Sequence, residues 1–329
     1  MKPEIKDEIF KIKDHVAFSE CALEIFRLQS AENKIYGEFI KSLGIEPSLI
    51  KSVSQIPFLP VEFYRSQRIV TGSLPHILAF ESSGTTGTAT SKHYVVDAEL
   101  YEKSFLNAFR LFYGDPEGYM IAALLPSYTE RKNSSLVYMM DSLIKRSSYS
   151  GSGFYRDDTG SMILAIEKAR SEKWQVLLVG VSFALLDLAE KYSPDLHDVI
   201  VMETGGMKGR RREITRMELH SVLKKAFNVE AIHSEYGMTE LLSQAYSKAG
   251  GIFHCPPWMK ILLRDPQDPL TIINEPEITG GINIIDLANI HSCSFISTGD
   301  LGKLHKDGSF EVLGRIDNSD IRGCNLLIE

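Results

Sequence analysis

The stretch from Trp174 to Thr204 reads WQVLLVGVSFALLDLAEKYSPDLHDVIVMET. It contains a short apolar run at 174–180, a helical pattern that extends to about Tyr192, and a second apolar run at 198–204. Two buried strands joined by a helix form a unit in which the strands run parallel. The stretch therefore predicts an α/β fold with a largely parallel sheet, in which ligands bind at the carboxyl ends of the strands.

The same alternation continues in both directions, over residues 77–235. Further strands are predicted at HILAFE (76–81), YMIAALLP (119–126) and VEAIHSEYG (229–237), and helices at Asp97–Phe112, Ser134–Lys145 and Arg210–Phe227. Ser134 is a residue type that caps helix N-termini. We therefore expect helices on both faces of a parallel sheet, and we assign residues 76–250 to one α/β subdomain.

The flanking regions have other patterns. Residues 4–43 carry apolar side chains at helical spacing, which Gly44 and Pro47 end, so residues 1–75 are predicted to be a helical N-terminal segment. Residues 251–314 are short strand-like pieces with Gly, Pro and Asp between them, which predicts a small, mostly antiparallel or barrel-like β-rich subdomain. Residues 315–329 form the remaining tail.

Composition excludes several classes of protein. The net charge is −7 and there is no long basic stretch, which disfavours nucleic acid as a partner. The N-terminus has no apolar signal-peptide region, and the longest apolar run, Val176–Leu186, is shorter than the roughly 20 residues of a membrane span. We expect a soluble cytoplasmic protein without a membrane span, whose scattered cysteines are free thiols.

The first candidate site follows the strand at 76–81 and reads ESSGTTGTATSKH from Glu81 to His93. Its glycines allow close backbone approach, and its hydroxyls and backbone N–H groups can surround phosphate oxygens. Lys92 adds a point charge. The Gly-Lys-Ser/Thr of a Walker loop is missing, and by composition alone this is equally an ordinary Ser/Thr/Gly loop.

Two further motifs offer nucleotide contacts. The motif SEYGMTE (234–240) lies after a predicted strand and before a predicted helix. Its Tyr236 presents a flat face for a purine, Gly237 suits a sharp turn, and Glu240 is an oxygen ligand suited to Mg²⁺. Asp300 in Thr298-Gly299-Asp300 can accept hydrogen bonds from ribose hydroxyls, and Arg315 can hold ribose or phosphate. Read singly, the first motif is equally a helix start capped by Thr, and the others are hairpin turns with a surface charge.

The order of these motifs resembles the adenylate-forming superfamily of acyl-CoA synthetases, luciferases and peptide-synthetase adenylation domains, over about residues 77–323. A closer resemblance is to the LuxE family of acyl-protein synthetases, and more distantly to phenylacetate-CoA ligases. It rests on the loop ending in Ser91-Lys92-His93, on LLPSYTERKNSSLVYMM (124–140), on GGMKGRRRE (205–213) and on SEYGMTELLSQAYS (234–247).

The resemblance implies ATP and Mg²⁺ as cofactors and a role for each matching position. The implied phosphate loop consists of Ser82, Ser83, Gly84, Thr85, Thr86, Gly87 and Thr88, with Lys92. Gly205 and Gly206 match the stretch that lines the adenine pocket, Tyr236 matches the aromatic residue that stacks on adenine, and Thr239 and Glu240 match the contacts to phosphate and Mg²⁺. Asp300 matches the ribose-binding aspartate, and Arg315 and Asp317 match the ribose contact and the hinge. Among these, the implied catalytic residues are Glu240, Lys92 and Arg315.

The resemblance also raises the question of the acyl acceptor. Most superfamily members continue beyond the hinge into a mobile domain of about a hundred residues, which supplies a lysine for adenylation. This sequence stops at Glu329, so that domain and its lysine are expected to be absent, and the protein would work without the lysine, use another residue or receive it from a partner chain. LuxE-like enzymes carry the acyl group on a cysteine near the C-terminus, which implies Cys324 here.

The function expected from the sequence is ATP-dependent activation of a fatty or aryl acid, transfer to Cys324, and delivery to an acyl-accepting reductase or carrier protein. Half of a split ligase that uses CoA, and a non-catalytic AMP-binding subunit, remain alternatives. Parts of Val137–Ile144 and Phe183–Leu186 are expected to line the acyl pocket.

Two weaker arrangements were weighed. His254-Cys255 with His291-Ser292-Cys293 could hold zinc, but without Cys-x-x-Cys spacing they are expected to be unrelated strand residues. A triad of Ser82, His93 and Asp97 is disfavoured because no Gly-x-Ser-x-Gly elbow is present.

Overall fold

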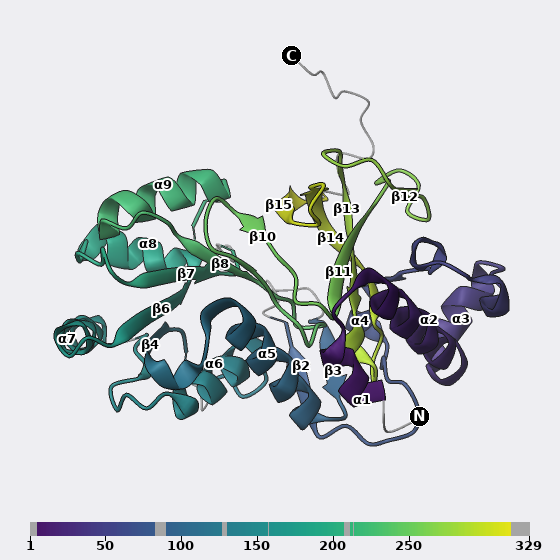
Figure 1. The fold of residues 1–329 in the computed structure, drawn as a ribbon, viewed down its shortest axis with the longest axis horizontal. Helices are drawn as coiled ribbons and strands as arrows, with labels where there is room; N and C mark the ends of the chain where they lie inside the picture. The colour runs from purple at the N-terminus through teal and green to yellow at the C-terminus, as the bar shows by residue number, and fades with distance from the viewer. Residues whose placement is uncertain are drawn as a thin grey trace, which may run out of the picture.

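The computed structural model describes residues 5–82, 90–126, 130–156, 158–206, 211–212 and 214–316. Within them the strands form a six-stranded sheet, a seven-stranded sheet and a two-stranded hairpin. Figure 1 shows the six-stranded sheet with its helices on one side of the molecule and the seven-stranded sheet with the N-terminal helices on the other. This mixed α/β architecture confirms the predicted fold class.

The six-stranded sheet has the order β5-β4-β6-β7-β8-β9. Its strands are β4 (Tyr119–Leu124), β5 (Gly153–Phe154), β6 (Gln175–Val181), β7 (Ile200–Thr204), β8 (His233–Tyr236) and β9 (Ala245–Ser247). Every pair is parallel except β8 with β9. The parallel sheet predicted from the alternating pattern is therefore confirmed.

Helices bury both faces of this sheet. They are α5 (Ala98–Tyr113), α6 (Ser135–Arg146), α7 (Thr159–Ser171), α8 (Ser182–Lys191) and α9 (Arg216–Phe227). Alternate residues of β4 show the division: Ile121 packs in one core with α5 and α6, and Met120 packs in the other with α7, α8 and α9. Figure 1 shows α5 and α6 on the face opposite α8 and α9. Burial on both faces explains why these strands are continuous apolar runs.

The seven-stranded sheet has the order β10-β15-β14-β13-β11-β12, with β1 paired to β14. Its strands are β1 (Leu59–Pro60), β10 (Ile252–Phe253), β11 (Met259–Arg264), β12 (Ile272–Ile273), β13 (Thr279–Asp286), β14 (Phe295–Leu304) and β15 (Phe310–Arg315). All its pairs are antiparallel except β1 with β14. The antiparallel character predicted for residues 251–314 is confirmed.

The N-terminal helices pack against the seven-stranded sheet. They are α1 (Ile5–Glu8), α2 (His15–Glu32), α3 (Lys34–Ser42) and α4 (Phe63–Ser66). Short 3-10 turns occur in this segment and elsewhere in the chain: η1 (Ile9–Lys11), η2 (Pro47–Leu49), η3 (Val53–Gln55), η4 (Pro116–Gly118) and η5 (Leu287–Asn289). Phe26 of α2 meets Phe295 of β14 at 6.1 Å between ring centroids. Buried Gln29 donates to the carbonyls of Asn289 and Ile290. The predicted helical segment is confirmed, and its apolar stripe faces the sheet.

One predicted strand lies elsewhere. HILAFE was expected to extend the parallel sheet, but β2 (Leu78–Glu81) pairs antiparallel with β3 (Lys92–Val95) in the separate hairpin. The connection from Glu81 to Lys92 is too short for the crossover that parallel neighbours need, so β2 and β3 pair antiparallel. Phe80 fixes the hairpin by packing on Tyr101 of α5 at 5.4 Å between ring centroids.

Two helix predictions are wrong, one in its start and one in its existence. Helix α9 begins at Arg216 rather than Arg210, because Thr215 and Glu218 form a capping box at its start. The expected helix after Glu240 is absent from the described structure. The backbone N–H groups of Leu242 and Ser243 donate instead to the buried Asp286 carboxylate at 2.7 and 3.0 Å, and that side chain replaces the helical hydrogen bonds. No helix among the described residues is long and apolar enough to cross a membrane.

Candidate functional site

A cavity of about 370 Å³ opens at the carboxyl ends of β7 and β8. Strand β2, helices α4, α5 and α6 and the end of β15 also contribute to its wall. The lining residues are Val61, Arg65, Glu81, Ser82, Ser91, Tyr101, Arg131, Ser134, Ser135, Leu136, Met139, Thr204, Gly205, Glu235, Gly237, Met238, Thr239, Glu240, Gln244 and Arg315. The structure thus brings together six predicted site residues from four distant segments: Ser82, Gly205, Gly237, Thr239, Glu240 and Arg315.

The segment Thr239–Glu240 is held from outside the cavity by two side chains. His93 Nδ1 lies 2.9 Å from the Thr239 carbonyl oxygen, and Asn289 Nδ2 donates to the Glu240 carbonyl at 2.7 Å. Both side chains are buried, so the backbone here is fixed in place of the missing helix. Its side chains are left to face the cavity.

The Glu240 carboxyl is only 5% exposed. Burial raises its pKa, while a hydrogen bond from Ser91 and the charges of Arg315 and Arg65 act in the opposite direction. A carboxylate in this position is stabilised by any further positive charge that enters the cavity. Glu240 is therefore suited to contact a cation that arrives with a ligand.

Each residue of the disfavoured triad has other partners in the structure. Ser82 Oγ accepts from the backbone N–H of Ser91 at 3.0 Å, and Asp97 caps helix α5 and pairs with Lys6. His93 is fully buried, and burial lowers its pKa to about 4. It is therefore neutral at pH 7 and donates its Nδ1 proton to the Thr239 carbonyl, which makes it a support for the cavity wall.

Asp300 and Arg315 meet across strands β14 and β15, where they are paired residues. Arg315 Nε lies 3.6 Å from Asp300 Oδ1. Tyr236 donates from its hydroxyl to Asp300 Oδ2 at 2.8 Å. Burial raises the pKa of Asp300, while Tyr236 and the neighbouring arginines oppose that rise. Both carboxylate oxygens are thus oriented, as recognition of a vicinal diol requires.

The ring of Tyr236 is packed between two phenylalanines. Its centroid lies 5.9 Å from that of Phe253 and 5.7 Å from that of Phe310, both in edge-on geometry. The described contacts of Tyr236 therefore place its hydroxyl on Asp300 and its ring in the aromatic cluster. Stacking on adenine stays a prediction.

Other predicted residues lie apart from the cavity wall or outside the described structure. Lys92 forms an ion pair with Glu81 at 3.1 Å with its side chain 47% exposed, and neither Lys92 nor Gly206 lines the cavity. Residues 83–88 of the expected phosphate loop, with Asp317 and Cys324, lie outside the described residues. Their roles stay predictions.

Sequence reasoning missed several lining residues. Thr204 ends strand β7 and donates from its hydroxyl to Glu235, which is 8% exposed. Its position at the carboxyl end of a predicted strand was the available signal. Arg65 and Arg131 are exposed cations of the wall. Arg65 lies on the four-residue helix α4, which no sequence pattern marked as part of a site.

Helix α6 also borders a smaller, apolar cavity next to the main one. Leu136, Met139 and Glu235 line both cavities. The rest of the smaller wall consists of Phe109, Met140, Leu143, Leu177, Val179, Met202 and Tyr246. Its free volume is only about 10 Å³. Part of the expected acyl-pocket segment 137–144 lines this space, whereas the segment 183–186 does not.

The cysteines that the structure describes are not activated. Burial raises the pKa of Cys21 to about 11 and that of Cys293 to about 12, and it raises that of Cys255 further. In the described parts of the chain no group of three or more His, Cys, Asp or Glu side chains could hold a metal ion, and this includes His254, Cys255, His291 and Cys293.

Solved structures of adenylate-forming enzymes share this combination of sheets and helices. ATP-bound MatB from Rhodopseudomonas palustris matches over 72% of this chain and 47% of its own, with 16% identity and a TM-score of 0.53. The luciferase-like enzyme from the nonluminescent mealworm Zophobas morio matches over 77% of this chain and 61% of its own, with 16% identity and a TM-score of 0.51.

The chain thus spans about half of the length of MatB and three fifths of that of the mealworm enzyme. At this level of identity the likeness is one of fold. No protein-family model matches the sequence, and no curated protein sequence matches it.

Proposed function

We propose that this protein activates a carboxylic acid with ATP to form an acyl-adenylate and then transfers the acyl group to a thiol. The carrying observation is the cavity that gathers Ser82, Thr239, Glu240 and Arg315 beside the Tyr236–Asp300 pair. The shared fold supports the proposal, because MatB has been crystallised with ATP bound.

In this proposal the nucleotide is held at two ends. Asp300 accepts hydrogen bonds from the ribose hydroxyls, with Arg315 beside it. The loop that follows Ser82 surrounds the phosphates, and Lys92 supplies a charge when it exchanges Glu81 for phosphate. Gly205 and Gly206 border the base. Arg65 and Arg131 add positive potential at the mouth of the cavity, which attracts an anionic ligand.

The first half-reaction joins the acid to AMP. A carboxylate oxygen of the acid attacks the α-phosphorus of ATP, the bond from that phosphorus to the bridging oxygen breaks, and pyrophosphate leaves with the electron pair. Hydrogen-bond donors and cations of the wall stabilise the charge that develops on the phosphates. Glu240 is suited to a divalent cation here, since Mg²⁺ is commonly bound through one or two carboxylates together with substrate phosphates. When bound, Mg²⁺ would neutralise phosphate charge.

The second half-reaction is acyl transfer. A thiolate attacks the carbonyl carbon of the mixed anhydride, AMP leaves, and a thioester remains. We propose Cys324 as the thiol, from its place in the resemblance to LuxE enzymes. Arg322, two positions earlier in the sequence, is a cation of the kind that favours a thiolate. An acyl-accepting reductase or a carrier protein would then receive the group. CoA is the alternative acceptor.

The acid is proposed to be fatty or aryl, because helix α6 contributes apolar side chains to the otherwise polar wall of the cavity. Leu136 and Met139 face the main cavity, and the smaller cavity behind them is lined almost entirely by apolar residues. Methionine side chains adapt to ligands of different shape. A longer acyl chain would require Met139 and Met140 to change rotamer.

The first test measures pyrophosphate release with ATP, Mg²⁺ and a panel of fatty and aryl acids, while hydroxylamine traps acyl-AMP. Acid-dependent release is expected from the wild type and from Glu117→Gln, whose carboxylate is exposed and remote from the cavity. Glu240→Gln is expected to lose it. If no acid stimulates pyrophosphate release above the background without acid, adenylation is wrong.

The second test uses radiolabelled acid to identify the acceptor. We expect a covalent adduct that neutral hydroxylamine removes, absent from Cys324→Ser and present in Cys21→Ser. Acyl-AMP formation should persist in both variants. Efficient conversion of added CoA without any labelling of the wild-type protein would instead establish CoA as the acceptor.

A further inference from the structure

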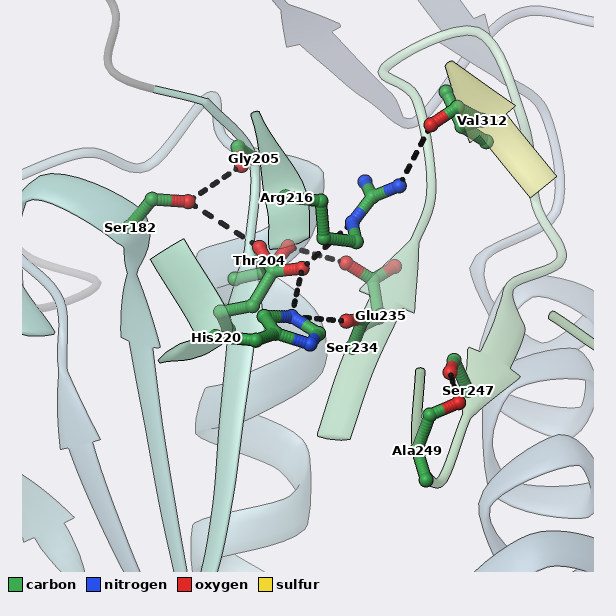
Figure 2. A network of polar contacts seen from close by, with 11 residues as sticks. Ser182, Thr204, Gly205, Arg216, His220, Ser234, Glu235, Ser247, Ala249 and Val312 are labelled. Carbon is green, nitrogen blue, oxygen red and sulfur yellow. Dashed lines mark hydrogen bonds and ion pairs between the residues drawn. The ribbon is translucent and has the colours of Figure 1, made fainter. Parts of the chain in front are cut away.

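A further buried carboxylate, that of Glu203, does not line the cavity. Glu203 on β7 is 2% exposed. Ser182 Oγ donates toward Glu203 Oε2 at 3.2 Å and toward the Gly205 carbonyl at 2.9 Å. His220 Nε2 lies 3.6 Å from Glu203 Oε1 and 3.3 Å from Ser234 Oγ. Figure 2 shows Ser182, Gly205, His220 and Ser234 in this network.

Arg216 compensates the buried charge of Glu203 and reaches into the other sheet. Its Nε donates to Glu203 Oε1 at 3.2 Å. Its Nη1 donates to the carbonyl of Val312 on β15 at 2.9 Å, a bond that Figure 2 shows. Burial alone would raise the pKa of Glu203, but His220, Arg216 and Ser234 together lower it. One planar guanidinium therefore connects β7 with β15.

The same arginine also contacts the aromatic cluster under the candidate ribose site. Its guanidinium carbon lies 4.9 Å from the ring centroid of Phe253. Phe253 packs on Tyr236, and Tyr236 donates to Asp300. A continuous series of contacts thus runs from Glu203 through Arg216 and Phe253 to the residues proposed to bind ribose.

We infer that Arg216, held by Glu203, is a positioning residue for the nucleotide site: it fixes β15 against β7 and thereby sets the geometry of Tyr236, Asp300 and Arg315. The inference rests on the proposed nucleotide binding. Two interactions in different directions need the fork of donors that arginine provides, whereas lysine is a single point of charge. Lysine keeps the positive charge over Phe253 but cannot reproduce both bonds in this geometry.

The test is AMP binding by calorimetry with Arg216→Lys and a matched control. The control is Arg170→Lys. Arg170 likewise pairs through its Nε with the carboxylate of Asp198 at 2.5 Å and donates from its Nη1 to the backbone carbonyl of Asp195 at 2.9 Å. It does not line the cavity. We expect the AMP dissociation constant to rise about tenfold in Arg216→Lys, as for loss of one charge-assisted hydrogen bond. It should not change in Arg170→Lys.

A second readout separates positioning from general loss of stability. Hydrogen exchange at Phe310–Arg315 should become faster in Arg216→Lys than in Arg170→Lys, and exchange in the remote strand β4 should stay equal in the two variants. If Arg216→Lys does not fold, the pair Glu203→Gln with Arg216→Gln replaces it, because it removes the buried charge together with its partner. The double variant should fold and show the same weak AMP binding.

The outcomes distinguish this inference from the proposed function. If the wild type and Arg216→Lys bind AMP equally well, the positioning role is wrong while nucleotide binding stands. If the wild type does not bind AMP, the proposed function fails and the inference falls with it. If exchange accelerates equally in β4 and β15, Arg216 is a structural residue only.

Discussion

The cavity has two walls of opposite charge and opposite exposure. We call Glu235 and Glu240 the acidic floor and Arg65, Arg131 and Arg315 the basic rim. The floor carboxylates are 8% and 5% exposed, whereas the rim arginines are exposed and the Arg315 side chain is 74% exposed. The floor is fixed by buried hydrogen bonds such as that from Asn289 to the Glu240 carbonyl.

Because of this difference in burial, we expect the floor to affect the stability of the empty protein and the rim to affect mainly the binding of a ligand. A buried carboxylate loses hydration when the chain folds, so Glu240 lowers the stability of the empty protein. An exposed arginine loses little hydration, so the rim should affect stability little and act mainly when an anion is present. We therefore expect floor substitutions to inactivate and stabilise the protein, and rim substitutions to weaken binding only.

The largest expected effect is that of Glu240→Gln on catalysis. Pyrophosphate release should fall by about a hundredfold or more, because one preorganised charge near the reacting phosphates is lost. The affinity for AMP, which lacks the β- and γ-phosphates, should change little. Equal losses of catalysis and AMP affinity would show that Glu240 supports the structure of the site instead.

The same variant should be more stable than the wild type. Burial raises the folded-state pKa of Glu240 above its usual value of 4.5, so the folded protein binds this proton more tightly than the unfolded chain. The wild type therefore loses stability as the pH rises from 4.5 through the folded-state pKa, whereas glutamine does not titrate. The midpoint of thermal unfolding of Glu240→Gln, relative to wild type, should increase over that pH range. A lower midpoint for Glu240→Gln than for the wild type at pH 7 would show that the buried Glu240 carboxylate does not destabilise the folded protein.

The next effect concerns the pair beneath the ribose site. Asp300→Ala should weaken AMP binding by about 1.5–3 kcal/mol, the range for a hydrogen bond to a charged group. Asp307→Ala is the matched control, since Asp307 lies in the turn between β14 and β15 and bonds only locally to Ser309 in the described contacts. The measurement is calorimetry, and an unchanged AMP affinity in Asp300→Ala would show that Asp300 does not bind ribose.

The smallest effect is expected at the rim. Arg65→Gln should weaken ATP binding about two- to fivefold, the range of an exposed charge pair, and the loss should shrink as salt is raised. Arg68→Gln is its control, because Arg68 is exposed and does not line the cavity. The guanidinium carbon of Arg68 lies 5.4 Å from the ring centroid of Tyr94. Unfolding midpoints should match in both variants. A salt-independent loss would mean that Arg65 makes a desolvated contact.

Periodicity predicted the sheet well because burial on both faces leaves apolar runs in β4, β6 and β7. It misplaced β2, since a short apolar run does not reveal which strand it will pair with. The helix expected after Glu240 failed for another reason: Asp286, 43 positions away from Ser243, takes the hydrogen bonds that a helix would need. Tertiary partners of this kind leave no local signal.

In the candidate site, too, local motifs predicted some residues, whereas residues that depend on tertiary contacts were missed. Motif order predicted Glu240, Asp300 and Arg315 as site residues, and the structure places Glu240 and Arg315 in the wall of one cavity and Asp300 beside Arg315. The connection between Glu203 and β15 had no sequence signal, because Arg216 is 13 positions from Glu203 and 96 from Val312. Arg65 was missed because a four-residue helix has too few residues to show a period.

The bonds of Gln29 have a consequence for the order of events during synthesis. Its amide group contacts the carbonyl of Asn289, 260 positions later in the chain. A ribosome adding about 5–20 residues per second needs on the order of 10–50 s to cover that distance. During that interval helix α2 exposes the apolar stripe that Phe295 later covers. Docking of the N-terminal helices on the seven-stranded sheet is therefore expected to be a late step in folding.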